Sequence, residues 1–320
     1  MKTIAVLTSG GDAPGMNAAI RAVVRAGIAM GMNVKGIRRG YAGLIEGDII
    51  DMDARSVSDI IHRGGTMLYT ARCPEFKTQE GVDKAVASCK KNGIDGIVVI
   101  GGDGSFRGAR DLSLSGIPCV GVPGTIDNDI SSTEYTIGYD TAMNTAMEMM
   151  DKLRDTSQSH ERCSVVEVMG RRAGYLALQT GVACGATSIL VPEVEFDLDK
   201  DVIQKIKKIK ETGKKHFVVV VAEGVGGVEA IADRIEQATG IESRATILGH
   251  VQRGGNPTVR DRVMASQFGY HAVELLSQGI GNRVVTYVNN KIGDEDIYEA
   301  LAMKKEFDME EYEMATAISI

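Results

Sequence analysis

The sequence predicts an α/β fold built on mostly parallel sheets, and three observations carry that prediction. Short β-branched runs alternate with segments of helical periodicity along the whole chain. Several of these runs end in glycine-rich turns, as strands do before a crossover helix. The 320 residues are enough for about two domains with large cores. Repeated strand–helix–strand units form parallel sheets with right-handed crossovers.

The elements expected in the first half follow from the spacing of apolar residues. Short apolar runs indicate strands, and apolar residues three and four positions apart indicate helices. In the first helix, Arg21 and Arg25 stand four residues apart and share one face. The expected strands are 3–7, 33–37, 96–100 and 117–122, and the expected helices are 17–30, 81–91 and 105–113.

A second series of alternating elements fills the rest of the chain. No low-complexity linker separates the two series, so the turn at Ile137-Gly138 marks the expected domain boundary. The expected helices are 141–154, 173–182, 198–211, 228–239 and 260–277, and the expected strands are 164–168, 188–191, 217–222, 246–248 and 283–288.

The composition is that of an ordinary globular protein. A net charge of −7 argues against a general binder of nucleic acid or membranes. No apolar run approaches the ~20 residues of a membrane helix, and no signal peptide precedes the first strand. The five cysteines are widely spaced and lack a C-x-x-C pair, which indicates a reducing, cytoplasmic compartment.

Two acidic turns follow apolar runs and are the most informative part of the sequence. One is Pro123-Gly124-Thr125-Ile126-Asp127-Asn128-Asp129, and the other is Gly101-Gly102-Asp103-Gly104-Ser105. Ligands of open parallel sheets bind beyond the carboxyl ends of the strands. Carboxylates at that place can hold Mg²⁺ and accept a proton from a hydroxyl group, which are the two tasks of phosphoryl transfer.

A third glycine-rich turn, residues 10–17, joins the first strand to the first helix. It suits phosphate at a helix N-terminus, although a plain strand–helix turn also needs glycine. Neither G-x-x-x-x-G-K-[ST] nor G-x-G-x-x-G occurs, since Gly108 lies one residue too far after Gly104. Asp103 in such a turn would repel a phosphate unless a metal ion lay between them, so we expect Asp103 to be a Mg²⁺ ligand.

Three glycine-flanked basic segments are candidates for binding a second, anionic substrate. They are Arg162 with residues 169–174, Glu223-Gly224 with Arg244 downstream, and residues 249–257. Guanidinium groups offer bidentate donors to phosphate, whereas a single isolated arginine would be interpreted as surface charge.

The remaining histidines and the cysteine at 73 are interpreted as non-catalytic. We expect structural or surface roles for His62, His160 and His271, because no paired metal ligand stands near them in the sequence. Cys73 lies beside Arg72 without an obvious histidine base, which favours a nucleotide-lining loop over a nucleophile.

These motifs occur together and in order along essentially the whole chain. The set comprises the turns at 10–17, 101–105 and 123–129, Met-Gly-Arg at 169–171 and Gly-His-Val-Gln-Arg-Gly-Gly at 249–255. The ordered set closely resembles the bacterial ATP-dependent 6-phosphofructokinase family. Gly-Gly-Asp-Gly alone also occurs in NAD kinases and diacylglycerol kinases, so the resemblance depends on the set.

The resemblance implies two Rossmann-like, three-layer domains with the active site in the cleft between them. Residues 1–138 plus 252–306 would bind ATP, and residues 139–251 plus 307–320 would bind fructose 6-phosphate. The protein would be a cytoplasmic, allosterically regulated homotetramer that catalyses the committed step of glycolysis.

The resemblance also implies a role for each site residue. Asp127 would be the general base for the 1-hydroxyl group of fructose 6-phosphate, with Thr125 beside it, and Arg171 would stabilise charge on the transferred phosphoryl group. Asp103 would hold Mg²⁺ with support from Asp129. The ATP site would comprise Gly11, Arg72, Cys73, Gly102, Asp103, Gly104 and Ser105. The sugar-phosphate site would comprise Thr125, Asp127, Arg162, Met169, Gly170, Arg171, Glu223, Arg244, His250 and Arg253, with Arg162 and Arg244 reaching in from a neighbouring subunit.

A regulatory site for ADP or phosphoenolpyruvate is implied in part. The matching residues are Arg21, Arg25, Arg154, Gly185, Lys214, Lys215 and His216. The family often has Glu where Thr187 stands and Arg where Ala54 stands, so we expect a weakened or altered response to ADP.

Two glycines favour ATP as the phosphoryl donor. Pyrophosphate-using relatives usually carry Asp at the position of Gly104 and Lys at that of Gly124, where the side chains would occupy nucleotide space. A pyrophosphate-dependent enzyme is thus the nearest alternative. A kinase of NAD or a lipid would share only Gly-Gly-Asp-Gly. A catalytically inactive regulator would have no chemical need for Asp103, Asp127, Asp129 and Arg171.

Overall fold

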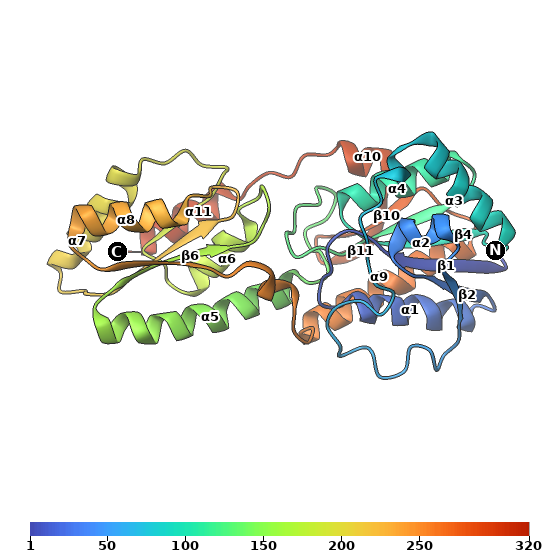
Figure 1. Cartoon of the computed structure of the whole chain (residues 1–320), viewed down its shortest axis with the longest axis horizontal. Helices are drawn as coiled ribbons and strands as arrows, with labels where there is room; N and C mark the ends of the chain where they lie inside the picture. Colours follow the sequence, from blue (N-terminus) through green and yellow to red (C-terminus); the bar gives the residue numbers. More distant parts are fainter. Residues whose placement is uncertain (320) are drawn as a thin grey trace. The chain divides into compact units, whose positions relative to one another are not determined.

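The computed structural model describes residues 1–319, which form two compact α/β units (Figure 1). Unit 1 contains Met1–Ile126, Ile130–Thr141 and Arg253–Lys305. Unit 2 contains Asp127–Asp129, Ala142–Gln252 and the described residues from Glu306 onward. The predicted α/β class with mostly parallel sheets is confirmed.

Unit 1 is built on a seven-stranded sheet with the order β11-β10-β5-β4-β1-β2-β3. The five inner strands run parallel, and the two edge strands β3 and β11 run antiparallel to their neighbours. The strands are β1 (Thr3–Thr8), β2 (Asn33–Ile37), β3 (Ile49–Met52), β4 (Gly96–Gly101), β5 (Cys119–Pro123), β10 (Arg283–Val288) and β11 (Lys291–Asp296).

Helices cover both faces of this sheet (Figure 1). Helices α1 and α9 pack against each other on one face, and the remaining helices of the unit lie on the other. The helices are α1 (Met16–Ala29), α2 (Gly40–Glu46), α3 (Gln79–Lys91), α4 (Asp103–Leu114), α9 (Val259–Ser277) and α10 (Ile297–Ala302).

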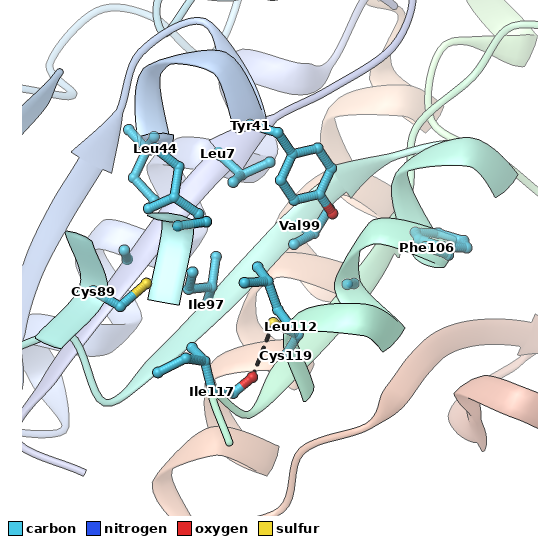
Figure 2. Packing of buried hydrophobic residues seen from close by; sticks show 14 of the residues in the cluster. Leu7, Tyr41, Leu44, Cys89, Ile97, Val99, Phe106, Leu112, Ile117 and Cys119 are labelled. Carbon is cyan, nitrogen blue, oxygen red and sulfur yellow. Dashed lines mark hydrogen bonds between the residues drawn. The ribbon is translucent and has the colours of Figure 1, made fainter. Parts of the chain in front are cut away.

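The core on the second face is a continuous apolar cluster (Figure 2). Leu7 of β1 and Val99 of β4 project from the sheet into side chains of the covering helices, among them Tyr41 and Leu112. Phe106 of α4 is 1% exposed and lies so close to Gly121 that a Cβ atom there would come within 2.7 Å of its ring. Phe106 therefore anchors α4, the helix that carries Asp103, against β5.

Unit 2 has a four-stranded, fully parallel sheet with the order β7-β8-β6-β9. Every residue of β8 is buried, as its uninterrupted Phe-Val-Val-Val-Val-Ala sequence predicts for a central parallel strand. The strands are β6 (Cys163–Val168), β7 (Ser188–Leu190), β8 (Phe217–Ala222) and β9 (Ser243–Ile247).

The helices of unit 2 pack around this sheet. Helices α7 and α8 cover one face through an aliphatic cluster, and α11 joins α6 through a 2.6 Å hydrogen bond from Gln179 to Glu311. The helices are α5 (Tyr139–His160), which begins in unit 1, α6 (Tyr175–Ala183), α7 (Gln204–Glu211), α8 (Val228–Thr239) and α11 (Met309–Ile318). A π-helical turn, Leu198–Ile203, precedes α7.

Differences from the predicted elements concern edges and short segments. The antiparallel strands β3 and β11 and the helices α2, α10 and α11 were absent from the predicted set, because each is short and lacks a clear periodicity. Strand β9 spans Ser243–Ile247, where 246–248 is predicted. Helix α5 continues to His160, beyond the predicted end at residue 154.

Among residues 1–319, no helix is both long enough and apolar enough to cross a membrane.

We expect Phe106→Ala to lower the free energy of unfolding by about 3–5 kcal/mol, because a buried aromatic side chain leaves a cavity when truncated. Urea unfolding followed by circular dichroism measures the change. Leu114→Ala, eight residues on in α4 and 68% exposed, is the matched control and should change stability by less than about 0.5 kcal/mol. Equal effects of the two substitutions would contradict the assignment of Phe106 to the core.

Candidate active site

Three neighbouring parallel strands of unit 1 deliver their glycine-rich turns to one sheet edge. The order β5-β4-β1 makes the turns at 9–15, 101–105 and 123–126 adjacent. Backbone contacts join them: Ser9 N–H donates to Ile100 O at 3.0 Å, and Gly124 N–H donates to Gly101 O at 2.9 Å. The buried Ser105 hydroxyl group donates to Ser9 O at 3.0 Å. The three turns therefore lie side by side at the carboxyl edge of this sheet.

Asp103 stands in the first turn of α4, directly after β4. Gly102 occupies the N-cap position and has no side chain to cap the helix, and its carbonyl oxygen accepts from the N–H groups of Ser105 and Phe106 at 2.8 and 3.1 Å. Gly104 is exposed, and a Cβ atom there would meet nothing within 4 Å. The turn can therefore admit an anionic ligand beside Asp103.

Arg253 contacts the first glycine-rich turn. Its Nη1 donates to Asp12 O at 3.2 Å, and a Cβ atom at Gly11 would overlap Nη1. Gly11 is therefore required for the close approach of this guanidinium group. Arg253 belongs to unit 1 and His250 to unit 2, so these two members of the predicted sugar-phosphate site lie in different units.

Tyr41 of α2 supports the 101–105 turn from the core of unit 1. This residue was not identified from the sequence. Its phenol donates to Ser105 O at 2.5 Å, and its ring stacks on Phe76 with centroids 4.0 Å apart. Burial raises the pKa of Tyr41 well above its ordinary value, so the hydroxyl group stays a hydrogen-bond donor. Because α2 is a short helix without a periodic signal, no sequence pattern pointed to this residue.

The long loop that carries Arg72 and Cys73 is tied to the first turn. Thr70, two residues before Arg72, donates to Gly10 O at 2.8 Å. The buried Asn17 amide donates to Gly64 O at 3.1 Å and accepts from Met67 N–H at 2.7 Å. Arg72 is exposed, and Cys73 is half-buried against the core cluster of unit 1. The loop thus lies beside the glycine-rich edge.

The segment after β5 carries the predicted base. Thr136 Oγ1 donates to Thr125 O at 2.6 Å. Asp127 is 5% exposed, and it is followed by Asn128 with a positive φ of 49°. Asp129 lies 3.9 Å from Nη1 of Arg171, whose side chain is 71% exposed. Because this contact is long and the side chain is exposed, the guanidinium group can bind another anion.

The carboxyl edge of the unit 2 sheet carries the predicted acceptor residues. Met169 follows β6, Glu223 follows β8 and His250 follows β9, and these strands are neighbours. Glu223 accepts a 3.0 Å hydrogen bond from the N–H of Arg171. Met169 N–H donates at 2.9 Å to Oε1 of Gln252, which is fully buried. The structure therefore gathers Met169, Gly170, Arg171, Glu223 and His250 at one edge.

Arg162 and Arg244 lie at the opposite edge of the same sheet. Arg162 immediately precedes β6, whereas Met169 follows it, so the strand separates them by about 20 Å. Both arginines pair with Glu242, with Nε of Arg162 at 2.7 Å and Nη2 of Arg244 at 2.6 Å from its oxygens. Within one chain, these two residues do not join the other predicted acceptor ligands.

The predicted effector residues divide between the units. Arg21 and Arg25 share α1 of unit 1, and burial followed by the charge of Arg25 lowers the pKa of Arg21. In unit 2, burial and then the charges of Lys214 and Arg154 lower the pKa of His216. Arg154 also donates to Cys184 O, next to Gly185. Lys215 instead pairs with Glu161 at 2.6 Å.

The residue at 187 is a buried threonine. Thr187 is 1% exposed, and its hydroxyl oxygen has no hydrogen-bond partner among residues 1–319. Its N–H donates to Val218 O at 2.7 Å, which fixes the backbone at the start of β7. Ala54 is exposed in unit 1.

Comparisons with known proteins give one consistent family. The family model described as "Phosphofructokinase" matches residues 3–276. A protein of Clostridium botulinum (strain Hall) named ATP-dependent 6-phosphofructokinase is 61% identical over 319 residues, covering all of both chains. A Bacillus cytotoxicus protein of the same name is 58% identical over 320 residues, again covering both chains completely.

Solved structures share the architecture. A phosphofructokinase of Saccharomyces cerevisiae superposes with a TM-score of 0.88 at 35% identity, over 99% of this chain and 47% of that one. A pyrophosphate-dependent phosphofructokinase from Marinobacter aquaeolei has a TM-score of 0.86 at 23% identity, over 97% and 86% of the respective chains, and shares the fold.

The cluster of Arg162, Arg244 and Glu242 predicts an acid-sensitive contribution to stability. Hydrogen bonds from Arg162 and then Arg244 lower the pKa of Glu242 below its ordinary value. A carboxylate whose pKa is lower in the folded state than in the unfolded state stabilises the fold at every pH above its unfolded-state pKa. That stabilisation is lost as the pH falls through the folded-state pKa. We expect the melting temperature of the parent to fall more steeply than that of Glu242→Gln below about pH 4.5.

Thermal melts between about pH 6 and about pH 3 test this expectation. Glu313→Gln, an exposed substitution on α11, is the control and should follow the parent curve. Parallel curves for the parent and Glu242→Gln would show that the cluster contributes nothing to folding.

Proposed function

Because this chain belongs to the phosphofructokinase family, we propose that it transfers the terminal phosphoryl group of ATP to the 1-hydroxyl group of fructose 6-phosphate. The full-length similarity to curated ATP-dependent 6-phosphofructokinases carries this proposal. The convergence of two acidic, glycine-rich turns at one sheet edge supports it, because phosphoryl transfer needs a metal-binding carboxylate and a base.

In the proposed mechanism, Asp127 accepts the proton of the sugar 1-hydroxyl group as its oxygen attacks phosphorus. Its near-complete burial supports the role, since a base shielded from water keeps the acceptor hydroxyl group in a fixed position. Arg171 stabilises the charge on the transferred group, and its 71% exposure with only a 3.9 Å contact to Asp129 leaves it available.

The acidic residues fit a Mg²⁺ ion that arrives with ATP. Mg²⁺ in kinases is bound by one or two carboxylates, while phosphates and waters complete its octahedron. Asp103 on its open turn provides such a ligand, and Asp129 would support it. No cluster of three or more metal-ligating side chains occurs within residues 1–319, as suits a metal shared with a substrate. The ion would neutralise charge on the phosphates.

We propose that Met169, Gly170, Arg171, Glu223, His250 and Arg253 bind fructose 6-phosphate together with Arg162 and Arg244 of a neighbouring subunit. The separation of about 20 Å along β6 supports a contribution from another chain, because no side chain spans that distance. A homotetramer would provide this arrangement. Glu242 would hold both arginines in place at the subunit edge.

The cationic cluster of Arg154, Lys214 and His216 is proposed to bind the phosphates of ADP or phosphoenolpyruvate, with Arg21, Arg25, Gly185 and Lys215. Burial and then the charge of Arg154 lower the pKa of Lys214, and burial followed by the charges of Lys214 and Arg154 lowers that of His216. The like charges support the proposal, since a bound anion would relieve their repulsion. Thr187 cannot ligate a cation as a carboxylate does, so the proposed response to ADP is weakened or altered. A cytoplasmic location is supported by five free cysteines.

We expect Asp127→Ser to lower kcat by about 10²–10⁴-fold and to change KM for fructose 6-phosphate only a few-fold, because it removes the base and leaves the phosphate ligands. Coupled assay of ADP release measures both constants. Asp95→Asn, at the amino end of the unit 1 sheet where its carboxylate accepts from Lys2 and Thr3 N–H groups, is a control. Near-parent turnover of Asp127→Ser would remove Asp127 from this role.

The proposed choice of ATP over pyrophosphate depends on Gly104 more than on Gly124. A Cβ atom at 124 would lie 3.0 Å from Cγ2 of Ile100 and 3.4 Å from Cε of Met16, inside the core. At 104 the space is open, so a carboxylate there could project toward the donor phosphates. A lysine at 124 would first require the core to move.

We expect the parent to use ATP and not pyrophosphate, and Gly104→Asp to lower kcat/KM for ATP by about 10-fold or more through charge repulsion. Gly104→Ala, which adds bulk without charge, should stay within about threefold. Parallel assays with each donor test both statements. Turnover with pyrophosphate alone would reverse the donor assignment, and equal losses for Asp and Ala would exclude repulsion as the cause.

A further inference from the structure

A completely buried carboxylate stands in the first turn of α9. Asp261 is 0% exposed, and four donors surround its two oxygens. Oδ1 accepts from the Tyr135 hydroxyl group at 2.6 Å and from Gly138 N–H at 2.7 Å. Oδ2 accepts from the N–H and the hydroxyl group of Thr141 at 2.9 and 2.5 Å. Burial raises the pKa of Asp261, and these hydrogen bonds oppose that rise.

All four donors belong to one short segment, residues 135–141, which we call the strap. The strap lies along the end of β5. Ile137 N–H donates to Pro123 O at 2.9 Å, and Gly124 and Ile137 form a parallel bridge. Thr136 Oγ1 then holds Thr125 O. The strap therefore fixes the backbone from 123 to 125, which ends two residues before Asp127.

The strap also contacts the first glycine-rich turn. Gly138 has φ of +100°, and a Cβ atom there would come within 2.7 Å of the Ala13 side chain and 3.2 Å of that of Ile126. A Cβ atom at Gly15 would lie 2.6 Å from Cγ2 of Ile137 and 3.5 Å from Cβ of Asp261. Three segments far apart in sequence thus meet without space for further atoms.

We propose that Asp261 is a positioning residue for phosphoryl transfer: its carboxylate anchors the strap, and the strap sets the place of Thr125 and Asp127. The inference rests on the proposed function, in which Asp127 is the base. Asp261 has no contact with the reactants in this role. A displacement of a catalytic group by about 1 Å can cost up to 10²-fold in rate, so an anchor of this kind is expected to affect kcat.

The test removes single donors to the carboxylate and leaves the carboxylate in place. Thr141→Val also removes the oxygen that accepts from the Thr258 N–H at 3.0 Å, which Thr141→Ser keeps. We expect Tyr135→Phe and Thr141→Val each to lower kcat about 10-fold, with KM for ATP and fructose 6-phosphate within about twofold, because binding groups remain while the base is displaced. Thr141→Ser keeps both donors to Oδ2 and should restore kcat to within about twofold of the parent. Asp261→Asn would set its amide against the Thr141 N–H and should be the most impaired variant.

Tyr287→Phe is the matched control. Its ring packs edge-on against that of Tyr135 at 6.5 Å, but its hydroxyl group donates to Asn290, away from Asp261. It should keep parent kinetics. The Tyr135 and Thr141 variants test the proposal even if Asp261→Asn does not fold.

Folded Tyr135→Phe and Thr141→Val proteins with parent kcat, including variants that only melt earlier or only raise KM, would overturn the proposal. Failure of the proposed function has a different signature: the parent would not phosphorylate fructose 6-phosphate with ATP, or Asp127→Ser would retain turnover. An active parent with an impaired Asp127→Ser and unaffected strap variants would remove Asp261 alone.

Discussion

Parallel pairing of β1, β4 and β5 is the constraint on which the candidate donor site depends. The register sets Thr8 opposite Ile100 and Ile100 opposite Val122. The three strands therefore end level with one another, and each continues into a glycine-rich turn at the same edge. Turns separated by more than twenty positions in the chain begin side by side there because strand ends, and not sequence neighbours, are adjacent.

The close approach of their backbones explains why these turns are rich in glycine. Carbonyl groups of Ser9, Gly101 and Asp12 each accept a hydrogen bond from another turn or from Arg253. Such contacts require segments to approach more closely than Cβ atoms allow. Rigidity then comes from buried polar supports behind the turns, of which the Tyr41 phenol and the Asp261 carboxylate are the clearest examples.

The length of the strands in the unit 2 sheet keeps two groups of basic residues apart. Its carboxyl edge presents Arg171, Glu223 and His250, while Arg162 and Arg244 share Glu242 at the amino edge. A strand of six residues is too long for any side chain to bridge. Residues with one chemical affinity, that of guanidinium for phosphate, are therefore divided between two surfaces of the same chain.

Sequence alone was sufficient for the α/β class, most inner strands and the three turns. Periodicity and glycine placement are local signals, and parallel crossovers leave few alternatives. It also pointed to Asp103, Asp127 and Asp129 as candidate site residues, since each stands in a turn that follows a strand.

Tertiary structure decided the antiparallel edges β3 and β11, the placement of Arg253 on the Gly11 turn and the buried anchors. Tyr135 and Asp261 are 126 residues apart, and neither stands in a motif. A buried carboxylate becomes favourable only when distant donors surround it, and that arrangement exists only in the folded chain.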